Sequence, residues 1–249
     1  SVVLPLLVPD SPTVVWWPGT PPPVPSQDPV GALAQRRITD CAAVPRPLAA
    51  LELRRQSYVA GDTDLSWTRT TPWRALLASV LDQPHEAIES VRVECQSSNP
   101  SGVLLAAWLR RALALPVQLV ASRGPGVTAV TVTTTGGDIA VSRPDGRVAT
   151  ISRPEFPDRE AALHRRTTEM LIAEELRRLD PDEIYGETLA ALADPQAAAP
   201  RKSSKSSAAP AGPSAPPAKA PDSRARASGE DGADNGAGTS SASRRKSDL

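Results

Sequence analysis

Two short clusters in the sequence combine arginine with groups that could bind an anion or a partner protein. The first is Arg36-Arg37-Ile38-Thr39-Asp40, in which two guanidinium groups stand close to one carboxylate. Arginine pairs bind phosphate or carboxylate groups through two parallel hydrogen bonds. The same residue types also form internal ion pairs, and a salt bridge between Arg37 and Asp40 is the simpler interpretation. The pattern leaves both an anion site and an internal bridge open.

The second cluster is the segment 64–74, which places two tryptophans and two arginines within eleven residues. Tryptophan and arginine contribute much of the binding energy at protein interfaces. Large aromatic rings also fill the junctions between packed elements. Contact surface and core are therefore equally good interpretations of the two rings. Together the two clusters give six candidate partner-binding residues: Trp67, Arg69, Trp73, Arg74, Arg36 and Arg37.

A pair of adjacent tryptophans, Trp16 and Trp17, ends the strand-like run T-V-V-W-W before Pro18-Gly19. Adjacent side chains on a strand point to opposite faces. We expect both rings to be largely covered, one on each face of a sheet with helices on both sides. A different hypothesis is that one ring stacks on a sugar while Arg36 and Arg37 hold a phosphate. The chain would then be a sugar-phosphate-binding protein or an enzyme of unrecognised type.

The usual signatures of catalysis and of cofactor binding are absent from the sequence. It contains no G-x-G-x-x-G or G-x-x-x-x-G-K-[ST] phosphate loop and no G-x-S-x-G nucleophile turn. Its two histidines, His85 and His164, have no partner at a spacing that suggests a triad, and we expect both to be solvated. Cys41 and Cys95 form no C-x-x-C motif and are expected to be free thiols rather than a disulfide or a zinc site. The sequence therefore predicts no catalytic residue, no cofactor and no metal.

The charge is distributed unevenly along the chain. The whole sequence has 28 basic and 28 acidic residues, but the segment 195–249 has nine basic and five acidic residues. An acidic body argues against a dedicated nucleic-acid surface, which needs clustered positive charge on the folded part. No apolar run is long enough to cross a membrane, and Val2–Val8 lacks the basic lead of a signal peptide. We expect a cytoplasmic protein that binds neither nucleic acid nor membrane.

The elements that must position these residues fall into two folded blocks. In the first block, residues 1–58, we expect a strand, a short helical segment, a second strand and a helix, at 13–17, 30–37, 38–41 and 47–57. A strand–helix–strand order is typical of an α/β unit. The chain starts inside an apolar run, so we interpret this block as the C-terminal part of an α/β domain whose start is missing.

The second block, residues 59–194, reads as a C-terminal α+β domain. Thr71-Pro72 and Asn99-Pro100 have the cap-then-proline pattern that begins a helix. Strands are expected at 88–95 and 117–121, followed by an antiparallel meander at 127–133, 138–142 and 147–151. A long helix over 157–179 and a terminal helix from Asp180-Pro181 to about 192 complete the block. The segment 195–249 is rich in Ala, Pro and Ser without an aromatic residue, so we predict a disordered tail.

Five stretches of the sequence are similar to one family. "LPLLVPDSPTVVWWPG", "RRITD", "DLSWTRTTPWR", "NPSGVLLAAWL" and "EELRRLDPDEIYGETL" resemble the actinobacterial OpcA family of glucose-6-phosphate dehydrogenase assembly proteins, over residues 1 to about 192. The resemblance implies a non-catalytic protein that assembles or allosterically activates this NADPH-producing dehydrogenase of the pentose phosphate pathway by protein–protein contact. It transfers no contact residues, so the six candidates rest on their chemistry alone.

Overall fold

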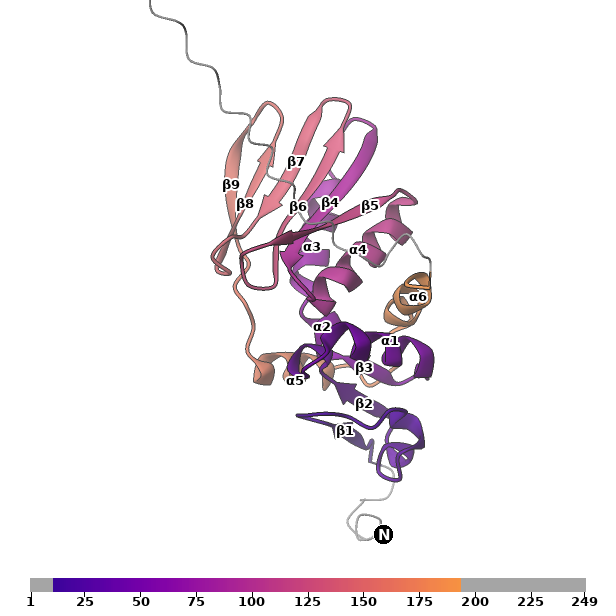
Figure 1. The fold of residues 1–249 in the computed structure, drawn as a ribbon. Helices are drawn as coiled ribbons and strands as arrows, with labels where there is room; N and C mark the ends of the chain where they lie inside the picture. Colours follow the sequence, from indigo (N-terminus) through magenta and orange to yellow (C-terminus); the bar gives the residue numbers. More distant parts are fainter. Residues whose placement is uncertain (1–10, 194–249) are drawn as a thin grey trace, which may run out of the picture. The chain divides into compact units, whose positions relative to one another are not determined.

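The computed structural model describes residues 11–193, which form two β-sheets with helices packed against them (Figure 1). The first sheet has three parallel strands in the order β1 (Val14–Trp16), β2 (Arg36–Thr39) and β3 (Asp62–Asp64). Parallel strands need long crossover connections. The connections carry three short 3₁₀ turns and one helix: η2 (Pro25–Gln27), η3 (Gly31–Leu33), η4 (Cys41–Ala43) and α1 (Pro47–Ser57).

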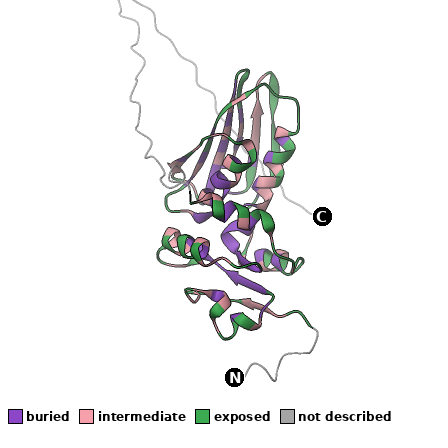
Figure 2. Ribbon diagram, turned by 90° about the vertical axis from the view of Figure 1, so that its right-hand side faces the viewer, coloured by how far each residue is buried: buried purple, intermediate pink, exposed green. Residues whose placement is uncertain are grey.

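The first sheet confirms part of the sequence prediction and corrects part of it. The strand at 13–17 and the helix at 47–57 are confirmed. The helical segment at 30–37 is wrong, because only Gly31–Leu33 forms a 3₁₀ turn and Arg36 already begins β2. The sequence did not predict β3 or the short helix α2 (Leu65–Thr68), since β3 consists of the polar residues Asp62, Thr63 and Asp64. Figure 2 shows this sheet with β2 and β3 buried.

The second sheet has six strands in the order β5-β4-β6-β7-β8-β9. β4 pairs with β5 in parallel, and every other pairing is antiparallel. The expected strands and the expected meander are confirmed, so the fold is α/β followed by α+β. The strand bounds are β4 (Ile88–Gln96), β5 (Val117–Ser122), β6 (Val127–Thr134), β7 (Gly137–Ser142), β8 (Val148–Arg153) and β9 (Phe156–Ala162).

The long helix predicted over 157–179 is wrong. Its first part is the edge strand β9, which pairs with β8, and only Thr168–Glu175 forms a helix, α5. Nearly every side chain of β9 is exposed, so the strand lacks the alternation of apolar and polar residues that marks a half-buried strand. Its Arg, Glu and Ala residues favour a helix locally, and the backbone pairing with β8 overrides that preference.

Helices α3 (Thr71–Leu81) and α4 (Pro100–Leu113) cover one face of the six-stranded sheet. Their inward side chains, such as Trp73 and Leu105, pack against strand residues such as Val93 and Val130 in one core cluster. The predicted cap at Asn99 is confirmed, since its side chain accepts a hydrogen bond from the Gly102 N–H at 2.9 Å. The residue that precedes α3 is Thr70 rather than the predicted Thr71.

A second core cluster joins helix α4 to helices α1, α2 and α6 (Glu183–Ala191). It contains Leu51, Trp67, Leu104, Tyr185 and Leu189. Asp182 immediately precedes α6, two residues after Asp180, where the sequence predicts the helix to start. Its side chain caps the helix by accepting a hydrogen bond from the Tyr185 N–H at 3.0 Å.

Two expectations about the organisation of the chain are not decided by the fold. The first sheet takes β1 and β2 from before residue 58 and β3 from after it, and the domain boundary at this residue stays a prediction. The disordered tail predicted at 195–249 lies outside the described residues, as do residues 1–10. Within residues 11–193, no helix is both long enough and apolar enough to span a membrane.

Candidate functional site

Arg36 and Arg37 lie on β2 and are both buried. Arg36 donates to the carboxylate of Glu175 on α5 and, at 2.8 Å, to the main-chain oxygen of Asp180. Arg37 donates to the Asp62 carboxylate on β3 and to two main-chain oxygens. Five of the six nitrogens of the two guanidinium groups therefore donate inside the fold, all except the Nε of Arg36, which disfavours the hypothesis that they hold the phosphate of a sugar.

The predicted salt bridge between Arg37 and Asp40 is wrong. Asp40 instead accepts from both terminal nitrogens of Arg69, each at 2.7 Å, in a bidentate pair. The parallel pairing of β2 with β3 places Arg37 directly beside Asp62, whereas Asp40 follows the end of β2 and caps η4 through the Ala42 N–H. Arg69 keeps 28% of its side chain exposed.

Trp67 and Trp73 are only 1% and 2% exposed, so both rings belong to the core. The indole N–H of Trp67 donates to Asp182 at 2.7 Å, and the guanidinium carbon of Arg74 lies 3.7 Å from the centroid of its ring. The sequence left contact surface and core open for these two rings, and the structure shows that both fill the junctions between packed elements. Contact of the six candidates with a partner stays a prediction, and Arg69 and Arg74 are the two of the six that are not buried.

Arg74 is the candidate whose charge has no partner. Its guanidinium donates to the hydroxyls of Thr70 and Thr71 at 3.1 and 3.2 Å, and no salt bridge within residues 11–193 includes it. Burial lowers the pKa of Arg74 to about 10, with nearby carboxylates acting in the opposite direction. A carboxylate from a binding partner would offset this cost of burying an unpaired charge.

The expectation that both adjacent tryptophans are largely covered is wrong for Trp16. Its side chain is 39% exposed at the end of β1, whereas Trp17 is half-buried and packs beside Gly31. The first sheet is small and β1 is its edge strand, so few elements are available to cover Trp16.

The two cysteines and the two histidines lie as the sequence predicts. Cys41 and Cys95 are free and buried, which confirms the prediction of free thiols. Burial raises the pKa of both thiols, to about 11 for Cys95. His85 and His164 are exposed, as expected. Across the part of the chain that the structure describes, no group of three or more His, Cys, Asp and Glu residues could hold a metal ion.

One feature that sequence reasoning missed is a cavity of about 370 Å³ between the starts of α3, α4 and α5 and the loops near β6 and β7, here termed the basic pocket. No acidic residue lines it. Arg69 and Trp73 are its two residues among the six candidates. The signal in the sequence is the run His164-Arg165-Arg166, which falls within the helix predicted over 157–179. The pocket is lined by Arg69, Pro72, Trp73, Asn99, Ser101, Gly126, Val127, Arg143, His164, Arg165, Arg166, Thr167 and Thr168.

Comparison with known families decides the relationship of the chain. The glucose-6-phosphate dehydrogenase subunit N-terminal domain matches residues 1–56, and the C-terminal domain of the same subunit matches residues 60–189. The chain belongs to the OpcA family. The resemblance inferred from its sequence motifs is thereby confirmed, and membership associates this OpcA-family chain with glucose-6-phosphate dehydrogenase. No curated protein matches it.

Solved structures show only a distant likeness to this OpcA-family chain. KijD10, a 3-ketoreductase from Actinomadura kijaniata in complex with TDP-benzene and NADP in an open conformation, is 10% identical, with 79% of each chain covered and a TM-score of 0.47. A Gfo/Idh/MocA family oxidoreductase from Vibrio cholerae is 11% identical over 63% of this chain and 67% of its own, with a TM-score of 0.30. Likeness at this level carries no argument about activity.

Proposed function

We propose that this chain is a non-catalytic assembly factor and allosteric activator of glucose-6-phosphate dehydrogenase, acting by protein–protein contact. The observation that carries the proposal is the family match, which covers both folded blocks with domains described as dehydrogenase subunit domains. The proposal includes a cytoplasmic location and neither a cofactor, a membrane nor a nucleic acid as a binding partner.

Activation by contact requires only a modest preference for the active state of the dehydrogenase. A protein shifts an equilibrium between two states by its difference in affinity for them. A tenfold change in activity corresponds to about 1.4 kcal/mol of such preference. One or two well-placed side chains at an interface can supply a difference of this size.

Arg74 and Trp16 are the side chains we propose for this contact. Arg74 carries a half-buried positive charge without an acidic partner, and a dehydrogenase carboxylate would complete it. Trp16 presents a large, partly exposed ring at the end of β1. Both residue types are common anchors at interfaces.

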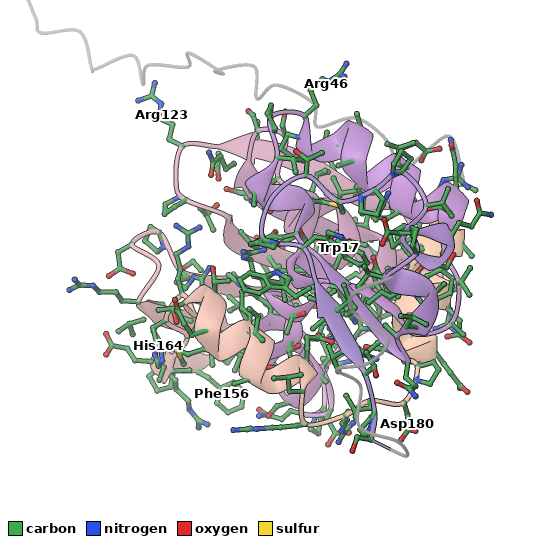
Figure 3. The ribbon with its side chains drawn as sticks, turned by 90° about the horizontal axis from the view of Figure 1, so that it is seen from below. Trp17, Arg46, Arg123, Phe156, His164 and Asp180 are labelled. Carbon is green, nitrogen blue, oxygen red and sulfur yellow. The ribbon has the colours of Figure 1, made fainter. Side chains whose placement is uncertain are left out.

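The test is a titration of the full 249-residue chain into purified dehydrogenase, with initial rate, substrate affinity and oligomer size measured together. We expect saturable activation. Arg74→Gln should raise the concentration needed for half-maximal activation by about tenfold, since it removes one charged anchor. Arg46→Gln is the matched control, because Arg46 extends away from the ribbon into solvent (Figure 3).

Two outcomes would overturn parts of this proposal. If a saturating amount of the chain changes neither rate, substrate affinity nor oligomer size, the chain is not an activator of the dehydrogenase. If activation occurs but Arg74→Gln and Arg46→Gln behave alike while both variants melt at the wild-type temperature, Arg74 is not part of the contact.

A further inference from the structure

We propose that the basic pocket binds the phosphate group of a small phosphorylated molecule. The pocket gathers residues from five separate segments of the chain, close to 69–73, 99–101, 126–127, 143 and 164–168. Its volume of about 370 Å³ lies at the lower end of the range for small-molecule sites, roughly 300–1,000 Å³.

Arg143 is the strongest evidence for an anion. It is 6% exposed, and its two terminal nitrogens donate to the main-chain oxygens of Leu163 and Val127 at 2.6 and 3.1 Å. Its guanidinium carbon lies 5.0 Å from the centroid of the Trp73 ring. The Nε atom has no hydrogen-bond partner, and no carboxylate within the described residues forms a salt bridge with this arginine. Arg143 is therefore a fixed, buried cation that lacks a counter-charge, and such a charge is costly unless an anion pairs with it.

The first turn of α4 supplies the second evidence. Ser101 lines the pocket at 5% exposure, and its hydroxyl oxygen has no hydrogen-bond partner. Pro100 has no N–H, and the Gly102 N–H donates to Asn99. The Val103 N–H donates to the main-chain oxygen of Asn99 at 3.3 Å, so Ser101 is the first-turn residue whose main-chain N–H remains for a ligand. The amino end of a 14-residue helix attracts anions through such donors and through the helix dipole.

The remaining cations of the pocket differ in how far the fold neutralises them. Arg166 pairs with Glu174, and Arg69 pairs with Asp40. Arg165 is exposed and forms no salt bridge within residues 11–193.

The potential that these cations create is positive. Burial and, second to it, the charge of Arg165 lower the pKa of Arg143 to about 10, while Asp145 acts in the opposite direction. Asp145 is an exposed turn residue whose carboxylate accepts from the Arg147 N–H at 2.8 Å, and it does not line the pocket.

A phosphate fits this arrangement better than a carboxylate does. Arg143 and Arg165 leave two positive charges without acidic partners, which matches the charge of nearly −2 on a phosphate monoester at neutral pH. The donors approach from different segments, on α4, at the end of β7 and before α5, and a tetrahedral group can accept from several directions at once. A planar carboxylate could accept from only two of these donors, both lying in its own plane.

The test uses the full chain without the dehydrogenase and measures binding by calorimetry and by thermal unfolding. The probes are inorganic phosphate and glycerol 3-phosphate, with glycerol as the unphosphorylated control and chloride to keep the ionic strength constant. We expect both phosphates, but not glycerol, to bind and to raise the melting temperature. Equal affinity for the two would mean that the phosphate group alone is recognised, and tighter binding of glycerol 3-phosphate would show that the organic part also contributes.

Two variants and one control locate the site. Arg165→Gln should weaken phosphate binding about tenfold by removing a charge-assisted donor. Ser101→Ala removes a hydroxyl that has no partner in the fold, so it should weaken binding without lowering the melting temperature of the free chain. Arg46→Gln should bind as the wild type does.

The proposal is overturned if neither phosphate binds at millimolar concentration, or if all three variants bind phosphate equally. Because no dehydrogenase is present, these results are independent of whether the chain activates that enzyme. A chain that activates the dehydrogenase without binding phosphate would contradict only the phosphate site.

Discussion

Replacing Glu175 with glutamine tests whether the buried ion pair between α5 and β2 holds the first sheet to the rest of the fold. The Glu175 carboxylate accepts from Arg36 and, at 2.6 Å, from the hydroxyl of Thr68. The side chains of Arg36 and Glu175 are 4% and 7% exposed. Glutamine keeps the shape of the side chain but removes the charge, so Arg36 remains buried without a carboxylate.

The expected loss follows from that burial. Breaking a buried ion pair by removing one partner costs about 3–5 kcal/mol of unfolding free energy. Arg36 keeps its hydrogen bond to the main-chain oxygen of Asp180, and the glutamine amide oxygen can still accept. We therefore expect a loss at the lower end of the range, about 3 kcal/mol. The double variant Arg36→Met/Glu175→Leu removes both charges. Its loss of unfolding free energy should be smaller than the sum of the losses in the single variants Arg36→Met and Glu175→Leu.

Urea unfolding of the full chain, followed by tryptophan fluorescence, measures these differences. The control is Glu187→Gln, which breaks a bridge to Arg111 in which both side chains are more than 40% exposed, so a change of about 1 kcal/mol or less is expected. If Glu175→Gln is no more destabilising than Glu187→Gln, or if the double variant loses the sum of its single changes, the pair is not the connection we describe.

Three further changes test other parts of the structure. Gly31→Ala should destabilise the chain by about 2 kcal/mol or more, because the added Cβ would lie 1.9 Å from the main-chain oxygen of Pro25; a melting temperature equal to that of the wild type would contradict this close approach. Trp16→Ala should cost less than about 3 kcal/mol, the lower limit for a fully buried tryptophan, since the ring is 39% exposed; a larger loss in urea unfolding would show that the ring is covered. Cys95 should stabilise the fold fully below its ordinary pKa of 9.0, and this stabilisation should be lost as the pH rises through about 11, because burial raises its pKa in the folded state; an unchanged pH slope in Cys95→Ala would refute the assignment.

Local sequence patterns predicted the elements in which the different signals of the sequence all indicate the same structure. The helices that begin at Pro47 and Pro100 and the alternating strands of the meander appear where the sequence indicates them. At Pro100 the Asn99 cap and the buried helix face agree, and in the strands the alternation agrees with the buried face. β9 fails this test, because an exposed edge strand needs no apolar face and its residues carry a helical preference.

The buried charges explain why the candidate site was only partly predicted. Arg36 and Arg37 occupy a fully buried strand, where apolar residues are the rule, and their counter-charges Glu175 and Asp62 are 139 and 25 residues away. The basic pocket is harder still to foresee. Arg143 lies more than twenty residues before Arg165 and more than forty after Ser101, and only the pairing of the strands brings these segments together.

The third strand of the first sheet has a practical consequence. β3 follows the Tyr58–Gly61 loop, yet its partner β2 precedes that loop. A chain divided at Val59-Ala60 would leave β2, with an unpaired hydrogen-bonding edge, on one piece and its partner β3 on the other. We therefore expect the pairing of β2 with β3 to form only when both pieces are present, which makes this loop a suitable place to split the molecule into a complementation reporter.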